Sequence, residues 1–322
     1  MDFKLIVTIG PSILSKIDKL QEIHHAGPCI FRLNGAHCSP QQLKIYAAIV
    51  RAVIPDAALM IDLPGNKIRT AGFTEKIRFD KNEAITLPGS SFNYEPFPGL
   101  LKKNDVILAN DSTLRFTVLE SSPERVTLRA EQKGELAGGK GMHVKGIGGA
   151  LPFLFQADRD LITAAAEMGL PYVSLSYVRT ADDVKGVKKL LADRQYAPNI
   201  IAKIETAAAL ENLDAILDEV DHANIDRGDL STDVGILKLA ECQEAVIKRA
   251  LAKRKRIFLA TQFLKNMEIH PVPLIPEVID LTNSIAKNIS GIQLSEETAV
   301  GVYPLECIRL IWDVYRNVRR ST

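Results

Sequence analysis

The sequence predicts an α/β protein: a (β/α)8 TIM barrel with an inserted all-β domain after its third strand. Short β-rich segments alternate with longer amphipathic segments in both terminal parts of the chain, and this alternation yields eight strands. In the middle of the chain it stops, and short β runs are separated by turn residues instead. The predicted domains are therefore a barrel over 1–70 and 150–322, and an insertion over 71–149.

Three strands precede the insertion and five follow it. The first three are Lys4–Ile9, Cys29–Leu33 and Ala58–Leu63, with helices predicted over 16–26 and 41–53. The other five are Tyr172–Ser176, Asn199–Glu205, His222–Ile225, Arg256–Ala260 and Gly291–Ser295, and a helix over 304–320 closes the chain. Eight strands, each followed by a helix or by the insertion, suit a closed parallel barrel better than an open sheet.

The insertion contains β runs such as "LRFTVLE" and "RVTLRAE", separated by the turn signals "LPGSS" and "ELAGGKG". It ends in the glycine-rich segment 145–150, "KGIGGA". That segment is equally suited to the hinge of a lid and to a flexible tether.

Composition limits the classes of function. The chain has 322 residues, 46% of them hydrophobic, with a formal net charge of +1 and no basic stripe, so neither a nucleic-acid partner nor a membrane is expected. No secretion signal is visible at the amino end. Four scattered cysteines (Cys29, Cys38, Cys242 and Cys307) form no CxxC motif and indicate reduced thiols in a cytoplasmic protein.

Polar residues follow nearly every predicted strand, at the rim where TIM barrels carry their active sites. Glu205 and Asp229 supply carboxylates suited to Mg²⁺, and Lys203 beside them suits an enolate or a transferring phosphoryl group. Arg32 suits a phosphate, and Thr261 lies on the same rim. Lys203 and Glu205 alone would favour a structural network that ties strands together; the whole set favours a functional site.

Eight motifs resemble the pyruvate kinase family in order and spacing: "TIGPS", "FRLN", "IDLPGNKIRT", "LSYVR", "AKIE", "DRGDL", "ATQFLKNM" and "LSEETAVGVYP". The resemblance spans almost the whole chain. It implies a barrel interrupted by a β-barrel lid, and the transfer of a phosphoryl group from phosphoenolpyruvate to ADP to give pyruvate and ATP. Mg²⁺ or Mn²⁺ is the implied cofactor.

The resemblance also implies a role for each matching residue. Lys203, Thr261 and Arg32 would be catalytic, and Glu205 and Asp229 would hold the metal. The substrate would be bound by Asp229, Thr261 and the backbone amides of Arg227 and Gly228. The nucleotide would contact Arg69, His37 and Lys140, and Asp111 would approach from the lid.

Some positions depart from the family pattern. Asn34 and Asp62 of the monovalent-cation pocket are kept, but Ala36 and Leu63 replace two oxygen ligands. Lys67 stands where potassium-dependent members have glutamate, so K⁺ is not expected to be required. The chain also stops where the family's regulatory domain usually begins, which predicts no sugar-phosphate control and leaves a small homo-oligomer open.

Other departures lie nearer the chemistry. Asp226 replaces a small residue beside the carboxylate pocket, and would repel phosphoenolpyruvate or favour a substrate with a donor group. Pro64 replaces a basic residue, Glu296 replaces glycine, and Gly35 replaces phenylalanine, which is expected to loosen the Arg32 loop.

Three interpretations follow. The first is a pyruvate kinase-like phosphotransferase. The second is a lyase or aldolase that forms an enolate from a pyruvate-like substrate, and the third is a non-catalytic protein that binds a phosphorylated metabolite. The complete set of central polar residues favours the first.

Overall fold

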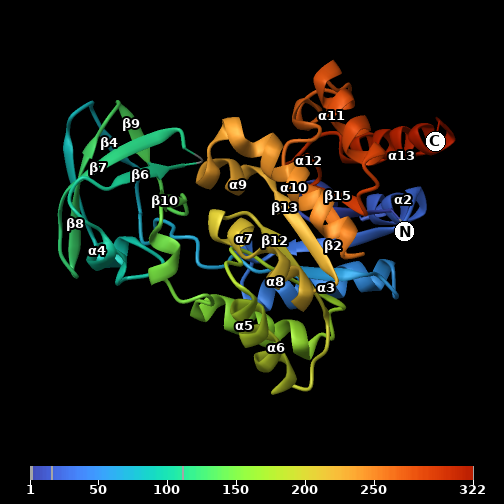
Figure 1. Ribbon diagram of the computed structural model, residues 1–322, viewed down its shortest axis with the longest axis horizontal. Coiled ribbons are helices and arrows are strands. Elements are labelled where there is room, and N and C mark those ends of the chain that lie inside the picture. The colour runs from blue at the N-terminus through green and yellow to red at the C-terminus, as the bar shows by residue number, and fades with distance from the viewer. Residues whose placement is uncertain (1–2, 16, 111, 322) are drawn as a thin grey trace. The chain divides into compact units, whose positions relative to one another are not determined.

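The computed structural model describes residues 3–15, 17–110 and 112–321 (Figure 1). The chain divides into two compact units, Met1–Pro64 with Gln156–Thr322, and Gly65–Phe155. The boundaries predicted from the sequence, 71 and 149, both lie inside the second unit. Lys16, predicted to begin a helix, lies outside the described residues.

The first unit is a closed barrel of eight parallel strands, which confirms the predicted fold class. Around the barrel the order is β1-β15-β14-β13-β12-β11-β3-β2. The strands are β1 (Lys4–Thr8), β2 (Cys29–Asn34), β3 (Leu59–Asp62), β11 (Tyr172–Leu175), β12 (Asn199–Ile204), β13 (His222–Asp226), β14 (Arg256–Ala260) and β15 (Gly291–Leu294).

Helices follow the strands, as the chain alternation predicts. The longer ones are α2 (Asp18–Ala26), α3 (Pro40–Val53), α5 (Gln156–Glu167), α6 (Ala181–Ala192), α8 (Leu213–Glu219), α9 (Arg227–Val234), α10 (Leu239–Ala252), α11 (Ile275–Ala286) and α13 (Pro304–Ser321). Short ones are α1 (Pro11–Leu14), α7 (Ala207–Glu211) and α12 (Glu296–Ala299), with 3-10 turns η1 (Gly35–His37), η4 (Ile236–Lys238) and η5 (Lys265–Glu268).

The second unit contains two antiparallel sheets. Five strands pair in the order β10-β6-β7-β8-β5, and β4 pairs with β9. The elements are β4 (Ile77–Phe79), β5 (Ala84–Pro88), η2 (Gly89–Ser91), α4 (Phe97–Leu100), β6 (Val106–Ala109), β7 (Leu114–Ser121), β8 (Arg125–Ala130), β9 (Gly134–Leu136), β10 (Met142–Val144) and η3 (Ile147–Ala150). The insertion is therefore mostly β, but the helix α4 shows that the prediction of an all-β domain was too simple.

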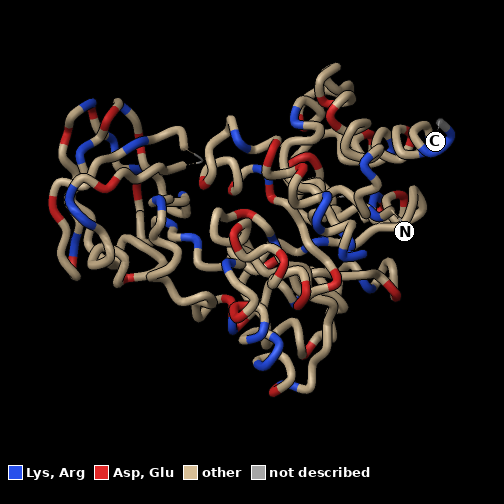
Figure 2. Tube along the Cα trace, in the orientation of Figure 1, with Lys and Arg blue, Asp and Glu red and all other residues tan. Residues whose placement is uncertain are grey.

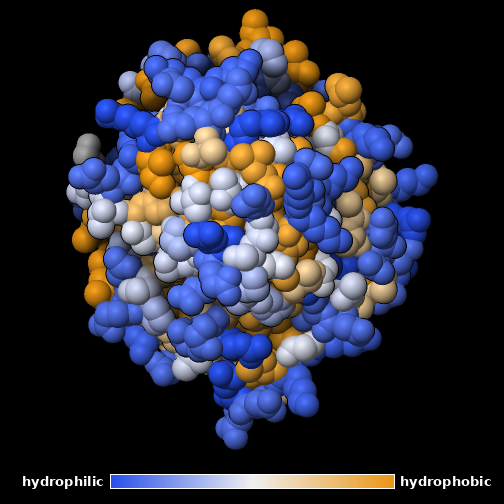
Figure 3. Space-filling view, turned by 90° about the vertical axis from the view of Figure 1, so that its left-hand side faces the viewer, coloured by the Kyte–Doolittle hydropathy of each residue, from blue (hydrophilic) through white to orange (hydrophobic). Residues whose placement is uncertain are grey.

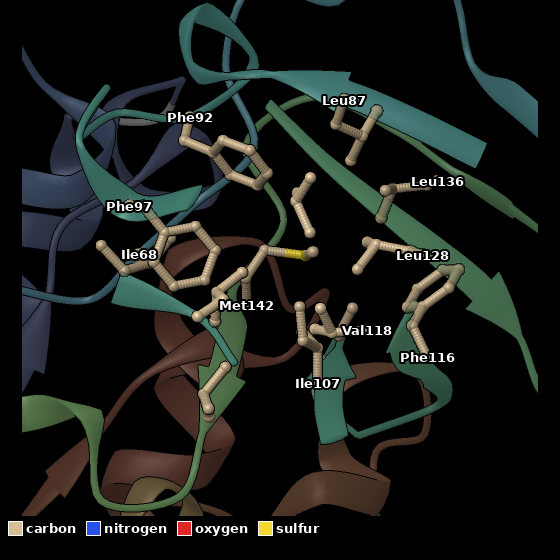
Figure 4. Packing of buried hydrophobic residues seen from close by; sticks show 14 of the residues in the cluster. Ile68, Leu87, Phe92, Phe97, Ile107, Phe116, Val118, Leu128, Leu136 and Met142 are labelled. Atoms are coloured by element: carbon tan, nitrogen blue, oxygen red, sulfur yellow. The ribbon is translucent and has the colours of Figure 1, made fainter. Parts of the chain in front are cut away.

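This unit has a hydrophobic core of its own. Phe97 and Phe116 are fully buried, and Phe92, Leu128 and Met142 pack in the same cluster (Figure 4). The inward residues of β7 and β8 alternate with exposed ones, because successive side chains of a strand point to opposite faces. A core of this size is what a unit needs in order to fold compactly.

The surface carries charges of both signs. Lys and Arg, and Asp and Glu, are distributed over both units (Figure 2), and hydrophilic residues are interspersed with hydrophobic ones on the face drawn in Figure 3. Among the described residues, no helix combines the length and the apolar character needed to cross a membrane.

One end of the barrel is filled by an apolar layer that includes Ile30, Met60 and Phe258. His222, at the start of β13, is only 6% exposed and packs on this layer, with its ring 5.8 Å from that of Tyr172 and 6.4 Å from that of Phe258. Among the described residues, its Nδ1 atom has no hydrogen-bond partner. Burial lowers the pKa of His222 to about 4, and the positive charge of Arg256 acts in the same direction.

We therefore expect acid to destabilise the protein through His222. The folded pKa lies below the unfolded value of 6.5, so the unfolded chain binds the proton more readily between these pH values. The free energy of unfolding should fall by about 3 kcal/mol through this residue as the pH drops from 6.5 to 4. Urea denaturation of the wild type and of His222→Phe over that range measures the effect.

The phenylalanine variant should lose this part of the pH dependence, while the exposed His24→Phe control should keep it. Identical slopes in the wild type and His222→Phe would contradict the prediction.

Candidate functional site

Strand register brings the polar residues to one rim of the barrel. Arg32 of β2 is paired with Thr8 of β1, and Asn34 of β2 is paired with Asp62 of β3. Lys203 lies near the end of β12, and Asp226 is the last residue of β13. Because all eight strands are parallel, their carboxyl ends meet at the same end of the barrel.

Lys203 is the centre of the cluster. Its side chain is 6% exposed, and its Nζ lies 2.9 Å from Oε2 of Glu205 and 3.0 Å from Oδ2 of Asp226. Nζ also donates a hydrogen bond to Oγ of Ser176, at 3.3 Å. Burial alone would lower the pKa of Lys203, but the surrounding carboxylates, Asp226 foremost, raise it well above the ordinary value. The carboxylates around it therefore favour the charged form of Lys203.

Glu205 is fully buried, and its two oxygens have different surroundings. Oε1 accepts a hydrogen bond from the backbone N–H of Tyr177, at 2.6 Å. Within the described part of the chain, Oε2 has the Lys203 ion pair but no well-aligned hydrogen bond. Burial raises the pKa of Glu205 to about 8; the charge of Lys203 opposes this, and those of Asp226 and Asp229 add to it. The cluster is thus short of positive charge.

These observations fit a divalent cation. One oxygen each from Glu205, Asp226 and Asp229 lie within 4.8 Å of one another. Carboxylate oxygens are the ligands that Mg²⁺ and Mn²⁺ prefer. A bound cation would supply the positive charge needed to balance the buried carboxylate of Glu205. Asp226 was not among the metal ligands expected from the sequence. Its position after a strand was the available signal.

Tyr177 is a further residue that the sequence analysis missed. It lies just after β11, with φ at 56°, a left-handed conformation that is rare for a residue other than glycine. Burial raises the pKa of its hydroxyl well above the ordinary value, as do the negative charges of Asp229 and Glu205, and its side chain is hydrogen-bonded to Asp229. Tyr177 thus contacts both predicted metal ligands, one through its backbone and one through its side chain.

Thr261 and Asp226 are joined directly. The Thr261 hydroxyl donates to Oδ1 of Asp226, at 2.7 Å. Burial would raise the pKa of Asp226, but Lys203 and the Thr261 hydrogen bond lower it well below the usual range. Thr261 itself has φ at 78°, and such a conformation costs a β-branched residue about 1–3 kcal/mol.

The side chain of Arg227 holds this strained segment. Its Nη2 and Nε donate to the carbonyl of Thr261, at 2.6 and 3.1 Å. Nη1 pairs with Asp280 of α11 at 2.6 Å, and the guanidinium lies 3.9 Å from the centre of the Phe263 ring. The sequence analysis had assigned only the backbone of Arg227. The hydrogen bonds of the guanidinium to the Thr261 carbonyl and to Asp280 give a structural reason for an arginine at this position.

Arg32 and the predicted monovalent-cation residues form a second group. Nε of Arg32 donates to Oδ2 of Asp62 at 2.7 Å, and Nη1 donates to Oγ1 of Thr8 at 2.9 Å. Oδ1 of Asn34 accepts the backbone N–H of Ala36 at 3.1 Å. Both Asn34 and Asp62 thus have protein partners.

Gly35 does not loosen the Arg32 loop as expected. A Cβ atom at this position would lie 2.8 Å from the carbonyl oxygen of Asp62 and 3.0 Å from Cδ of Pro64. Gly35 is therefore closely packed, and two of the unusual residues, Gly35 and Pro64, fit against each other.

The residues predicted to contact the nucleotide lie in both units. His37 lies in η1, directly after β2. Arg69 and Lys140 belong to the second unit, where Arg69 bridges to Gly141 and the Thr70 N–H donates to the Lys140 carbonyl at 2.9 Å. Lys67 also belongs to this unit. Asp111 lies outside the described residues.

Comparison with known proteins identifies the class. The family model "Pyruvate kinase, barrel domain" matches residues 2–308. The chain belongs to this family. Its relatives are named as pyruvate kinases, which indicates a phosphotransferase enzyme. The lyase and the non-catalytic interpretations are therefore not favoured.

Particular relatives are similar over nearly the whole chain. Pyruvate kinase II of Salmonella typhimurium is 29% identical over 324 residues, which cover 95% of this chain and 67% of that protein. The pyruvate kinase of Buchnera aphidicola subsp. Baizongia pistaciae is 30% identical, covering 96% and 68%. That of Thermotoga maritima is 29% identical, covering 99% and 71%.

Replacement of Arg227 by methionine should destabilise the fold by about 2–4 kcal/mol, because the charged hydrogen bonds to a strained carbonyl are lost. Denaturation by guanidinium chloride measures the loss. Arg249, whose ion pair with Asp214 is exposed, is the matched control, and Arg249→Met should cost less than about 1 kcal/mol. Equal costs would contradict the assigned role of Arg227.

Proposed function

We propose that the protein transfers a phosphoryl group from phosphoenolpyruvate to ADP and forms pyruvate and ATP. The observation that carries the proposal is the buried Lys203 ammonium, ion-paired with Glu205 and Asp226 in a cluster that also contains Asp229. A cation held rigidly in a buried, carboxylate-rich site is suited to stabilising the negative charge that develops on a phosphoryl group and an enolate.

Glu205 and Asp229 would hold Mg²⁺ or Mn²⁺, with Asp226 beside them. When bound, such an ion supplies positive charge to the oxygens of the phosphoryl group and of the enolate. Oε2 of Glu205, which has an ion pair with Lys203 but no hydrogen-bond partner among the described residues, supports this assignment.

The chain's own residues perform the other parts of the reaction. The bond from phosphorus to the enol oxygen breaks while a bond to the terminal phosphate oxygen of ADP forms, and the enolate then takes a proton at carbon. Lys203 would stabilise the charge at the enol oxygen, and Arg32 would bind the phosphoryl oxygens. The Thr261 hydroxyl donates its hydrogen to Asp226, so its oxygen would accept a hydrogen bond from the water that delivers the proton to the enolate carbon. The first-turn amides of Arg227 and Gly228 in α9 would receive the carboxylate of the substrate.

The second unit would act as a lid. Arg69 and Lys140, whose backbones are adjacent within it, would contact the nucleotide together with His37. Lys67 would supply the charge of the monovalent cation. We also propose a cytoplasmic location and small-molecule partners, with homo-oligomerisation left to measurement.

Pyruvate should form from phosphoenolpyruvate, ADP and Mg²⁺, as followed by a coupled lactate dehydrogenase assay. Lys203→Ala should lower kcat at least about 100-fold, because the buried cation at the reacting oxygen is lost. Lys253→Ala, which removes an ion pair at the end of α10, should leave kcat within about two-fold. A folded wild type that forms no pyruvate, or a fully active Lys203→Ala, would contradict the proposal.

Activity should not depend on K⁺. Replacing tetramethylammonium by K⁺ at constant ionic strength should change the rate less than about two-fold, because the ammonium of Lys67 already supplies the charge. Lys67→Met should lower the rate in both salts, and the exposed control Lys102→Met should not. A strong stimulation of the wild type by K⁺ would show that Lys67 does not replace the ion.

A further inference from the structure

Asp226 occupies an unusual position at the start of α9. It is the N-cap residue of that helix, yet its side chain makes no capping hydrogen bond. Its two oxygens instead meet Thr261 at 2.7 Å and Lys203 at 3.0 Å. The carboxylate therefore engages two of the groups that the proposed reaction uses.

The packing around Gly228 locates this carboxylate further. A Cβ atom on Gly228 would lie 3.1 Å from Cγ2 of Thr261 and 3.5 Å from Oδ1 of Asp226. Asp226 and Thr261 thus lie beside the first turn of α9, whose backbone N–H groups favour an anion. The carboxylate of Asp226 therefore lies next to the first turn of α9, whose amides at Arg227 and Gly228 are those that the proposed function assigns to the acid group of phosphoenolpyruvate.

The balance of charges in the cluster also disfavours a ligand with a carboxylate beside Asp226. The cations Lys203 and Arg32 are surrounded by the carboxylates of Asp62, Glu205, Asp226 and Asp229. A divalent ion would neutralise the surplus. Phosphoenolpyruvate then brings its own carboxylate and phosphate into a site that contains one more negative charge than it would with a small neutral residue at position 226.

We propose that Asp226 is a specificity residue that selects against a carboxylate and in favour of an uncharged hydrogen-bond donor at this position. The substrate class remains an enol phosphate, as in the proposed function, and a member that carries a carboxamide or hydroxyl group where phosphoenolpyruvate carries its acid group should bind more tightly than phosphoenolpyruvate itself. This inference rests on the proposed function for the location of the substrate, but it concerns binding and does not require turnover.

The physical basis is the difference between acceptor and donor. A carboxylate has only acceptor oxygens and repels Asp226, whereas an amide N–H or a hydroxyl can donate a hydrogen bond to it. Thr261 and Lys203 each engage one oxygen of Asp226, but a carboxylate oxygen can accept more than one hydrogen bond, so a donor on the ligand can still be bound while a second carboxylate is repelled.

Oxalate and oxamate test this directly, since they differ only by the exchange of one carboxylate for a carboxamide. Isothermal titration calorimetry in the presence of Mn²⁺ gives the Kd of each ligand. The ratio of the oxalate Kd to the oxamate Kd should be at least about ten-fold larger in the wild type than in Asp226→Ala. Asp226→Asn, which keeps the shape and removes the charge, should lower the ratio in the same direction.

Asp233→Asn is the matched control, because it removes a carboxylate from the same helix at a position where that carboxylate accepts the N–H of Ala207. This variant should keep the wild-type ratio. The proposal is overturned if both folded Asp226 variants keep that ratio within about two-fold, or if no variant binds either ligand.

The coupled assay separates this inference from the proposed function. A shifted ligand ratio without pyruvate formation in any variant would support the role of Asp226 and contradict the proposed reaction. Pyruvate formation with an unshifted ratio would overturn the role of Asp226 alone.

Discussion

The buried ammonium of Lys203 is the constraint on which the rest of the site depends. Removing such a cation from water costs several kcal/mol, and only carboxylates at ion-pair distance offset that cost. Glu205 follows the same strand, and Asp226 ends the next one, so the barrel register must be correct before the pairs can form. A slip by one residue would turn Lys203 to the other face of β12.

The barrel meets this requirement by separating two kinds of packing along its length. His222 and Phe258 lie in contact on an apolar layer near the strand starts. Further along, Asn224 donates to Gln293 across the barrel at 2.9 Å, and the charged groups follow at the strand ends. The apolar layer provides stability that does not depend on the charges, so the rim can retain a surplus of negative charge that would be unfavourable in an isolated cluster.

Much of this arrangement was predictable from local patterns. Runs such as Arg256–Ala260 are apolar and β-rich, and their regular spacing predicts a parallel barrel whose polar strand ends converge. The partners within the rim were not predictable. The left-handed backbone of Tyr177 and Thr261, and the contact of the Arg227 side chain with a carbonyl, depend on loop geometry that sequence spacing does not encode. The helix α4 within the insertion has only 4 residues, which is too short to produce a helical periodicity of apolar residues in the sequence.

The departures from the family pattern divide into two physical kinds. Gly35 and Pro64 change shape together: the missing side chain at 35 leaves the space that the carbonyl of Asp62 and the ring of Pro64 occupy. The Arg32–Asp62 pair, at 2.7 Å, forms beside these two residues. Asp226 changes charge, and the cation that it pairs with, Lys203, is shared with Glu205. Under the proposed role of Asp226, the substitution that bears on the choice of ligand is the one that changes charge, and not the two that change shape.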